Sequence, residues 1–289
     1  MTLVASRDAG PLTPQDAARA LAYAQGRDMV WLEAGRAVEF LAPRAPDRQA
    51  LSSLLSHRYV DIFLTKPRGR RKAVLVADMD STIVTSETLD ELAAHAGLKD
   101  RIAAITTRAM NGELDFHEAL RERVGLLKGL PCAALEKTIQ ALEYNPGARQ
   151  LVATMHSFGA TTALVSGGFD VFTAHVAKIL GFDIHRANHL LDDGNTLTGE
   201  VDEPILGKDA KRATLEELAA TRGVKLSATL SVGDGANDLP MLKAAGLGIA
   251  YRAKPIVMAE TLNHIVHTDL TSLLFAQGYP ASSFKDADG

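Results

Sequence analysis

An unbroken apolar run at residues 73–77 leads directly into two aspartates, Asp78 and Asp80. A short run without a polar interruption is typical of a strand that is buried on both faces of a parallel sheet. The two aspartates then lie at the carboxyl end of that strand, where doubly wound α/β proteins bind their ligands. Two close carboxylates repel each other unless a cation or a shared proton compensates their charge. The sequence therefore predicts a parallel α/β fold with a charged site at this strand end.

Two later strands of the expected sheet also end in small and polar residues. Ser166-Gly167-Gly168 follows one apolar run, and residues 233–238, with the sequence Gly-Asp-Gly-Ala-Asn-Asp, follow another. Because parallel strands end at the same edge of a sheet, we expect the three clusters to lie together. The Ser166 hydroxyl and the two glycine amides would donate hydrogen bonds to an anion such as phosphate, at the start of a helix.

The carboxylates of these clusters offer only oxygen ligands. They belong to Asp78, Asp80, Asp234 and Asp238. Hard oxygen donors favour Mg²⁺. An aspartate beside a phosphate can also attack phosphorus and form an aspartyl-phosphate, which divides a difficult reaction into two easier steps. An upstream lysine would balance the charge of the phosphate. The residues thus favour metal-assisted phosphoryl transfer.

A basic stretch at residues 66–72 divides the chain of 289 residues into two parts. Residues 1–66 are expected to form strands and helices in the order βαββαβ, which is that of a ferredoxin-like module. Beyond the boundary, strands alternate with helices, which indicates a parallel sheet with right-handed crossovers. We predict a doubly wound core, residues 73–86 and 145–284, with residues 87–144 inserted as a helical cap.

The cap is expected to begin with a capped helix. Thr88 and Glu91 have the spacing of a capping box. In this motif the threonine side chain accepts a hydrogen bond from the backbone amide of the acidic residue, and the acidic side chain accepts one from the backbone amide of the threonine. Apolar residues recur at helical spacing over residues 89–96, and Gly97 ends the pattern.

The bulk composition narrows the classes of function. A net charge of −4 at pH 7 provides no basic field for nucleic acid. A single cysteine, Cys132, excludes a disulfide within the chain and fits a reducing compartment. No apolar run approaches the length of a membrane span, and the N-terminus lacks the blocks of a signal peptide. We expect a cytoplasmic protein that binds neither nucleic acid nor membrane.

The motifs together resemble those of the haloacid dehalogenase (HAD) superfamily of phosphatases. Within it, residues 109–116, 120–124, 165–170 and 232–238 are similar to the phosphoserine phosphatase family, and the similarity spans roughly residues 73–270. The resemblance implies a HAD-like core and Mg²⁺-dependent hydrolysis of phosphoserine to serine and phosphate through an aspartyl-phosphate. It also implies a place for the enzyme at the last step of serine biosynthesis.

This resemblance implies a role for each carboxylate. Asp78 corresponds to the nucleophile. Asp80 corresponds to the general acid that protonates the serine oxygen and then, as a base, activates water. Mg²⁺ would be held by the Asp78 carboxylate, the backbone carbonyl of Asp80 and Asp234. Asp238 would support these ligands without binding the metal itself.

The resemblance also implies how the phosphate is held. Ser166, Gly167 and Lys211 would bind it, and Asn237 would lie beside it. Both Lys208 and Lys211 precede the third cluster, and Lys211 is the one that aligns with the family pattern.

In the cap, the resemblance assigns Glu87 to the substrate ammonium and Arg123 to its carboxylate, while Met110 and Phe116 would form an apolar lid. Arginine suits a carboxylate because its guanidinium can bind both oxygens. Structural roles remain alternatives: a first-turn helix charge for Glu87, a solvated ion pair with Glu118 or Glu122 for Arg123, and plain core packing for the two lid residues.

Two functional alternatives also remain open. A related enzyme would pass the phosphoryl group to another alcohol, such as homoserine, or hydrolyse another small phosphomonoester. Residues 1–66 resemble a small ACT-like domain in their element order, so this part is a candidate amino-acid-binding module, or a dimerisation module that would give a homodimer. No ligand-binding glycine motif is evident between its first strand and first helix.

Overall fold

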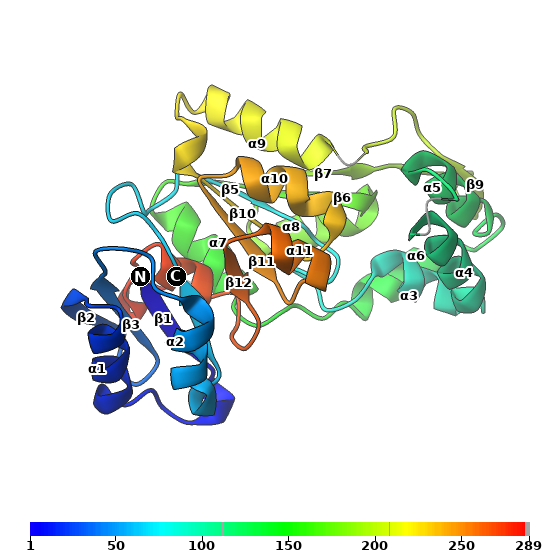
Figure 1. Ribbon diagram of the computed structural model, residues 1–289. Helices are drawn as coiled ribbons and strands as arrows, with labels where there is room; N and C mark the ends of the chain where they lie inside the picture. Colours follow the sequence, from blue (N-terminus) through cyan, green and yellow to red (C-terminus); the bar gives the residue numbers. More distant parts are fainter. Residues whose placement is uncertain (111–112, 208, 287–289) are drawn as a thin grey trace.

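The computed structural model describes residues 1–110, 113–207 and 209–286, without the side chains of residues 109 and 110. An antiparallel sheet lies at one end of the molecule, a parallel sheet lies in the middle, and a group of helices lies at the other end (Figure 1). Within the described ranges, no helix combines the length and the apolar character needed to cross a membrane.

The N-terminal part is a four-stranded antiparallel sheet with two helices. Its strand order is β2-β3-β1-β4. The elements are β1 (Thr2–Ala5), α1 (Pro14–Tyr23), β2 (Arg27–Glu33), β3 (Ala37–Leu41), α2 (Arg48–Leu54) and β4 (Val60–Phe63). They follow one another in the predicted order. Apolar side chains of both helices, including Ala17 and Leu51, pack on the strands in a cluster separate from the rest of the core.

The middle part is a six-stranded parallel sheet with the strand order β12-β11-β10-β5-β6-β7. The strands are β5 (Val74–Ala77), β6 (Thr161–Phe169), β7 (Ile184–Asn188), β10 (Thr229–Gly233), β11 (Leu247–Tyr251) and β12 (Asn263–Ile265). The predicted parallel sheet is confirmed. Strand β5 lies between β10 and β6, so the three strands that carry the polar clusters are immediate neighbours.

Helices cover both faces of this sheet. They are α7 (Ala148–Ser157), α8 (Asp170–Leu180), α9 (Ala210–Thr221), α10 (Leu239–Ala244), α11 (Pro255–Glu260) and α12 (Ser272–Ala276). Leu75 and Ala77 of β5 pack in the cluster that contains α7, α8 and α12, whereas Val74 and Val76 pack in the cluster that contains α9, α10 and α11. The apolar run is therefore buried on both faces, as its composition predicts.

Four helices follow β5 before the sheet resumes, in the region predicted as the cap. They are α3 (Thr88–His95), α4 (Lys99–Met110), α5 (Phe116–Gly125) and α6 (Ala133–Gln140). A small hairpin of β8 (Leu190–Asp192) and β9 (Leu197–Val201) lies beside them, with β9 next to α5 (Figure 1).

The predicted capping box at the start of α3 is wrong. The N-cap residue is Glu87, whose side chain makes no capping hydrogen bond, and Thr88 is already the first helical residue. The backbone amide of Thr88 donates instead to the carboxylate of Asp80, at 2.8 Å. A side chain eight residues upstream therefore accepts the first backbone amide of the helix.

Buried polar contacts join the N-terminal part to the parallel sheet. Asp61 in β4 accepts hydrogen bonds from the backbone amides of Val266 and Thr268, at 3.0 and 2.9 Å. Arg36 forms an ion pair with Asp269 at 2.8 Å. This attachment lies at the end of the parallel sheet that is remote from α3–α6 (Figure 1).

Candidate active site

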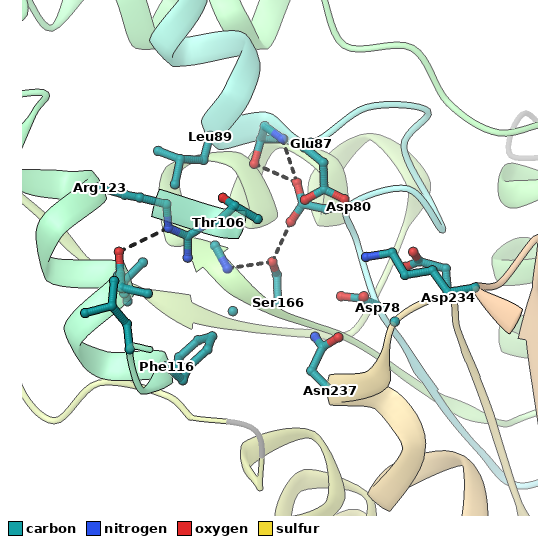
Figure 2. A pocket seen from close by; sticks show the side chains of 18 residues that line it. Asp78, Asp80, Glu87, Leu89, Thr106, Phe116, Arg123, Ser166, Asp234 and Asn237 are labelled. Carbon is teal, nitrogen blue, oxygen red and sulfur yellow. Dashed lines mark hydrogen bonds between the residues drawn. The ribbon is translucent and has the colours of Figure 1, made fainter. Parts of the chain in front are cut away.

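The three polar clusters at the ends of β5, β6 and β10 meet in one cavity. Its volume is about 370 Å³, and it extends between the sheet edge and the helices α3–α5. Figure 2 shows Asp78, Asp234 and Asn237 on one side, Arg123 and Phe116 on the other, and Ser166 between them. The expectation that adjacent parallel strands bring these residues together is confirmed. The lining residues are Asp78, Asp80, Glu87, Thr88, Leu89, Thr106, Leu114, Phe116, Ala119, Leu120, Arg123, Ser166, Gly167, Gly168, Asp234, Gly235, Asn237 and Lys254.

A buried lysine lies between two aspartates at the base of the site. The Nζ atom of Lys211, on α9, is 2.6 Å from a carboxylate oxygen of Asp78 and 2.6 Å from one of Asp238. Burial alone would lower the pKa of Lys211, but Asp238 and Asp78 outweigh it and raise the pKa. Lys211 therefore carries a positive charge at neutral pH. Lys208, the other candidate, lies outside the described residues.

Three carboxylates gather around this lysine. Oxygen atoms of Asp78, Asp234 and Asp238 all lie within 4.8 Å of one another. Burial and then the charge of Asp238 raise the pKa of both Asp78 and Asp234. The charge of Lys254 also acts on Asp234, but two lysines do not balance three carboxylates, so the cluster fits a divalent cation bound by oxygen ligands.

Asp238 is already engaged within the protein. One of its oxygens accepts from Lys211, and the other accepts the backbone amide of Gly235 at 2.9 Å. A Cβ atom at Gly233 would lie 2.4 Å from the Asp238 carboxyl carbon, so the glycine leaves the space that this side chain occupies. This position suits the supporting role expected for Asp238 better than that of a metal ligand.

The carboxylate of Asp80 points away from the acidic cluster. One oxygen accepts the amide and the hydroxyl of Thr88, at 2.8 and 2.7 Å, and the other accepts the Ser166 hydroxyl at 2.8 Å (Figure 2). The Ser166 oxygen in turn accepts the amide of Gly168 at 2.8 Å. These bonds hold the Asp80 carboxylate toward Thr88 and Ser166, which agrees with the expectation that the backbone of this residue is its metal ligand.

Glu87 and Arg123 lie on the cap side of the cavity. The Ser81 hydroxyl donates to Glu87 at 2.8 Å. Partial desolvation, followed by the charge of Asp80, raises the pKa of Glu87. Desolvation lowers the pKa of Arg123, while Asp90 and Glu87 oppose this change. Glu87 and Arg123 thus place a carboxyl group and a guanidinium group in the same wall of the cavity.

The alternative ion pair of Arg123 is not supported. Glu122 pairs with Arg108 at 2.8 Å, and Glu118 accepts the backbone amide of Asp115 at 3.0 Å. The Nε atom of Arg123 donates to the carbonyl of Ala119 at 3.2 Å, which fixes the guanidinium along α5.

Phe116 begins α5 and lies over the Ser166-Gly167-Gly168 segment. A Cβ atom at Gly167 would come within 3.3 Å of the Phe116 ring, so the glycine permits this close approach. Phe116 thus lines the cavity as expected. Met110 ends helix α4, and its side chain lies outside the described residues.

Several lining residues were not predicted from the sequence. They are Thr88, Leu89, Thr106, Leu114, Ala119, Leu120 and Lys254. Lys254 follows β11, the next strand after β10, and its backbone amide donates to the Asp234 carbonyl at 3.3 Å. The rule that parallel strands end at one edge would have indicated Lys254 if it had been applied to a fourth strand.

Comparison with known proteins agrees with this geometry. The model of the haloacid dehalogenase-like hydrolase family matches residues 75–243. A phosphoserine phosphatase from Streptococcus thermophilus is 48% identical over 203 residues, which cover 70% of this chain and 94% of that protein. Some relatives are longer: the match to the phosphoserine phosphatase of Streptomyces coelicolor, at 39% identity, covers 84% of this chain but 60% of that protein.

Two solved structures extend the comparison. A HAD family hydrolase from Salmonella enterica serovar Typhi has a TM-score of 0.84 at 30% identity, covering 95% of this chain and 96% of its own. A phosphoserine phosphatase solved as a phospho-aspartyl intermediate analogue has a TM-score of 0.65 at 41% identity, covering 71% of this chain and 98% of its own. The first match covers so much of this chain that it includes most of the N-terminal part. The second match covers a share of this chain about equal to that of the residues that follow the N-terminal part.

Proposed function

This chain belongs to the haloacid dehalogenase-like hydrolase family, and we propose that it is a phosphatase that converts O-phospho-L-serine to L-serine and phosphate. The observation that carries the proposal is the composition of one cavity. Asp78, paired with the buried Lys211, lines the cavity together with Ser166, while Glu87 and Arg123 offer partners for an ammonium and a carboxylate. Phosphoserine carries all three groups. Relatives named phosphoserine phosphatase, such as the 48% identical protein, support the same substrate. The proposed product, serine, is the reason to place the reaction in serine biosynthesis.

The reaction proceeds in two steps through Asp78. Its carboxylate oxygen attacks phosphorus while the bond from phosphorus to the seryl oxygen breaks, and Asp80 gives that oxygen a proton. Water then attacks phosphorus, the bond to Asp78 breaks, and Asp80 takes a proton from the water. Lys211, whose Nζ atom is 2.6 Å from Asp78, would balance the charge of the phosphate oxygens, and Ser166 and Gly167, which line the cavity, would bind them. Asn237 lies beside the transferred group.

The acidic cluster fits Mg²⁺ as the cofactor. The carboxylates of Asp78 and Asp234 and the backbone carbonyl of Asp80 would hold it, with Asp238 in support. The close spacing of the carboxylates and their raised pKa values support a cation here. When bound, Mg²⁺ supplies positive charge that stabilises the transferring phosphoryl group.

The amino-acid end of the substrate binds the cap. Glu87 would accept the ammonium, and Arg123 would bind the carboxylate with two parallel hydrogen bonds. Phe116, with Met110, would cover the site and limit the access of water. A pocket built for charged groups discriminates against substrates that leave those partners unpaired.

A phosphate-release assay tests this proposal. Phosphoserine is compared with phosphothreonine and other small phosphomonoesters, with Mg²⁺, with EDTA, and with homoserine as an acceptor. We expect phosphoserine to have the highest kcat/KM, EDTA to abolish turnover and added Mg²⁺ to restore it. A faster reaction with another monoester, or phosphoryl transfer to homoserine, would contradict the proposed substrate and reaction.

The division into domains is part of the same proposal: residues 1–66 as an ACT-like, ferredoxin-like unit, residues 73–86 and 145–284 as the core, and residues 87–144 as the cap. The succession of elements and the antiparallel strand order β2-β3-β1-β4 support the first unit. Its use in amino-acid binding or in a homodimer stays a prediction.

A further inference from the structure

The carboxylate of Asp80 has two chemically different oxygens. One oxygen, Oδ1, accepts both the backbone amide of Thr88, at 2.8 Å, and its hydroxyl, at 2.7 Å. The other, Oδ2, accepts the hydroxyl of Ser166, at 2.8 Å, and no second donor from the residues that the structure describes. A carboxylate oxygen has about two lone-pair positions, so Thr88 fills those of Oδ1 while Oδ2 keeps one free.

Thr88 is itself held in place by its position in the fold. It is the first residue of α3, it is only 1% exposed, and it lines the cavity. The N-cap residue Glu87 does not cap the helix, so Asp80 is the acceptor for this helix terminus. The helix dipole also favours a negative charge at this point.

We propose that Thr88 is a positioning residue that determines which oxygen of Asp80 exchanges the proton. This inference rests on the proposed function and adds a residue to it. With both lone pairs of Oδ1 occupied, a proton can be placed there only by displacing a donor, so Oδ2 is the oxygen that can exchange the proton. Thr88 thereby fixes both the orientation of the acid and the site of its proton.

The proton balance follows from this assignment. In the first step, Oδ2 of Asp80 gives its proton to the seryl oxygen as phosphorus leaves that oxygen and bonds to Asp78. In the second, a water oxygen bonds to phosphorus, the bond to Asp78 breaks, and Oδ2 takes up one proton from the water. Asp80 returns to its starting state, and Oδ1 stays bonded to Thr88 throughout.

The hydrogen bond from Ser166 to Oδ2 of Asp80 implies that phosphate binding comes before proton transfer. In the structure, Ser166 donates to Asp80, yet the same hydroxyl is proposed to bind the phosphate. An arriving phosphate takes that hydroxyl and frees Oδ2 to face the seryl oxygen. Thr88 prevents the carboxylate from turning when this bond is lost.

The test compares Thr88→Val, which removes the hydroxyl and keeps the shape, with Thr88→Ser, which retains the hydroxyl. The matched control is Thr138→Val: Thr138 is equally buried in the cap, and its hydroxyl donates to the Ala134 carbonyl at 3.0 Å, away from the cavity. For each variant, the rapid release of the leaving alcohol is measured in the first turnover of phosphoserine, phenyl phosphate and p-nitrophenyl phosphate. A thermal melt of each protein verifies the fold.

The three substrates differ in their need for an acid. Serine and phenol must be protonated as they leave, whereas p-nitrophenolate leaves as the anion. In Thr88→Val we expect the release of serine and of phenol to slow roughly tenfold or more, because general acid catalysis contributes about 10²- to 10⁴-fold and the variant loses part of it. The release of p-nitrophenolate should change less than about twofold, because it needs no acid. Thr88→Ser and Thr138→Val should retain the wild-type rates.

Equal losses with all three substrates, no loss in Thr88→Val, or the same loss in Thr88→Ser would overturn the role of Thr88. If phosphoserine is a poor substrate while the two aryl phosphates differ as expected, the inference stands and the proposed substrate fails. The two proposals are therefore tested separately by one set of measurements.

Discussion

Arg123 is the side chain that we propose sets substrate choice in this cavity. It is half-buried on α5, its Nε atom is bonded to Ala119, and its guanidinium lies across the cavity from the acidic cluster (Figure 2). Desolvation disfavours its charge, and Asp90 and Glu87 offset this effect. A substrate carboxylate would remove the remaining penalty, so the side chain contributes most when an anion occupies its side of the pocket.

Replacing this side chain therefore affects one class of substrate. Arg123→Gln should lower kcat/KM for phosphoserine by roughly 30-fold or more, because leaving a desolvated charge unpaired costs about 2 kcal/mol or more. Phosphoethanolamine, which lacks the carboxylate, should be hydrolysed at an unchanged rate. Arg121→Gln is the control, since Arg121 is an exposed residue of the same helix that pairs with Glu203 at 2.6 Å. An equal loss with both substrates would contradict carboxylate binding by Arg123.

At the scale of single elements, α1 provides a second case in which a carboxylate organises a helix start. Asp16 accepts the amide and the hydroxyl of Thr13 and pairs with Arg58 at 2.9 Å and with His57 at 3.1 Å. Burial would raise the pKa of Asp16, but the hydrogen bonds from Thr13, Arg58 and His57 hold it well below its ordinary value of 3.8. The charged form of Asp16 therefore stabilises the folded state.

This pKa depression has a defined pH dependence. A lowered folded pKa gives stability that is fully present above the unfolded value and is lost as the pH falls through the range below it. Asp16→Asn should lower the free energy of unfolding by roughly 2 kcal/mol at neutral pH, from a weakened cap and lost charged hydrogen bonds. The difference from wild type should shrink as the pH falls below 3.8. Urea unfolding across this range measures it.

Asp47→Asn is the control for this prediction. Asp47 is the exposed N-cap of α2, where its carboxylate accepts two backbone amides, and asparagine caps helices about as well as aspartate. This variant should therefore differ little from wild type. A constant stability gap for Asp16→Asn at all pH values would show that charge is not the cause.

Elements differ in how far the sequence predicted them. Strand β5 and the polar ends of β6 and β10 were predictable, because apolar runs and parallel pairing are local patterns with few structural solutions. The start of α3 was not, since Thr88 has the spacing of a local capping box but bonds to Asp80. The start of α3 is bonded to a side chain from outside the helix, and the spacing of residues within the helix does not predict such a contact.

For the molecule as a whole, the sequence predicted the succession of parts but not how they are joined. The buried carboxylate of Asp61 binds backbone amides of the segment after β12, and Arg36 pairs with Asp269. Nothing in the pattern of residues 1–66 distinguishes these two side chains from other charged residues on the same elements. Their contacts fix the N-terminal part at the end of the sheet opposite the cap helices (Figure 1).

The parallel sheet and the helices after β5 supply the residues of the cavity, and the N-terminal part supplies none. The sheet edge supplies Asp78, Asp80 and Ser166, and the cap helices supply Glu87 and Arg123, so the cavity is completed without any residue of the N-terminal part. In the proposed mechanism, the reaction depends on one event at that edge, the bonding of phosphorus to Asp78.

That event can be observed directly. The protein is mixed with Mg²⁺ and phosphoserine, quenched in acid within the first turnover, and digested, and the covalently bound phosphate is located by mass spectrometry. We expect an acyl phosphate on Asp78, formed at the rate at which serine is released. Phosphate bonded to any other residue, or serine release with no phosphorylated protein at any time, would contradict the mechanism.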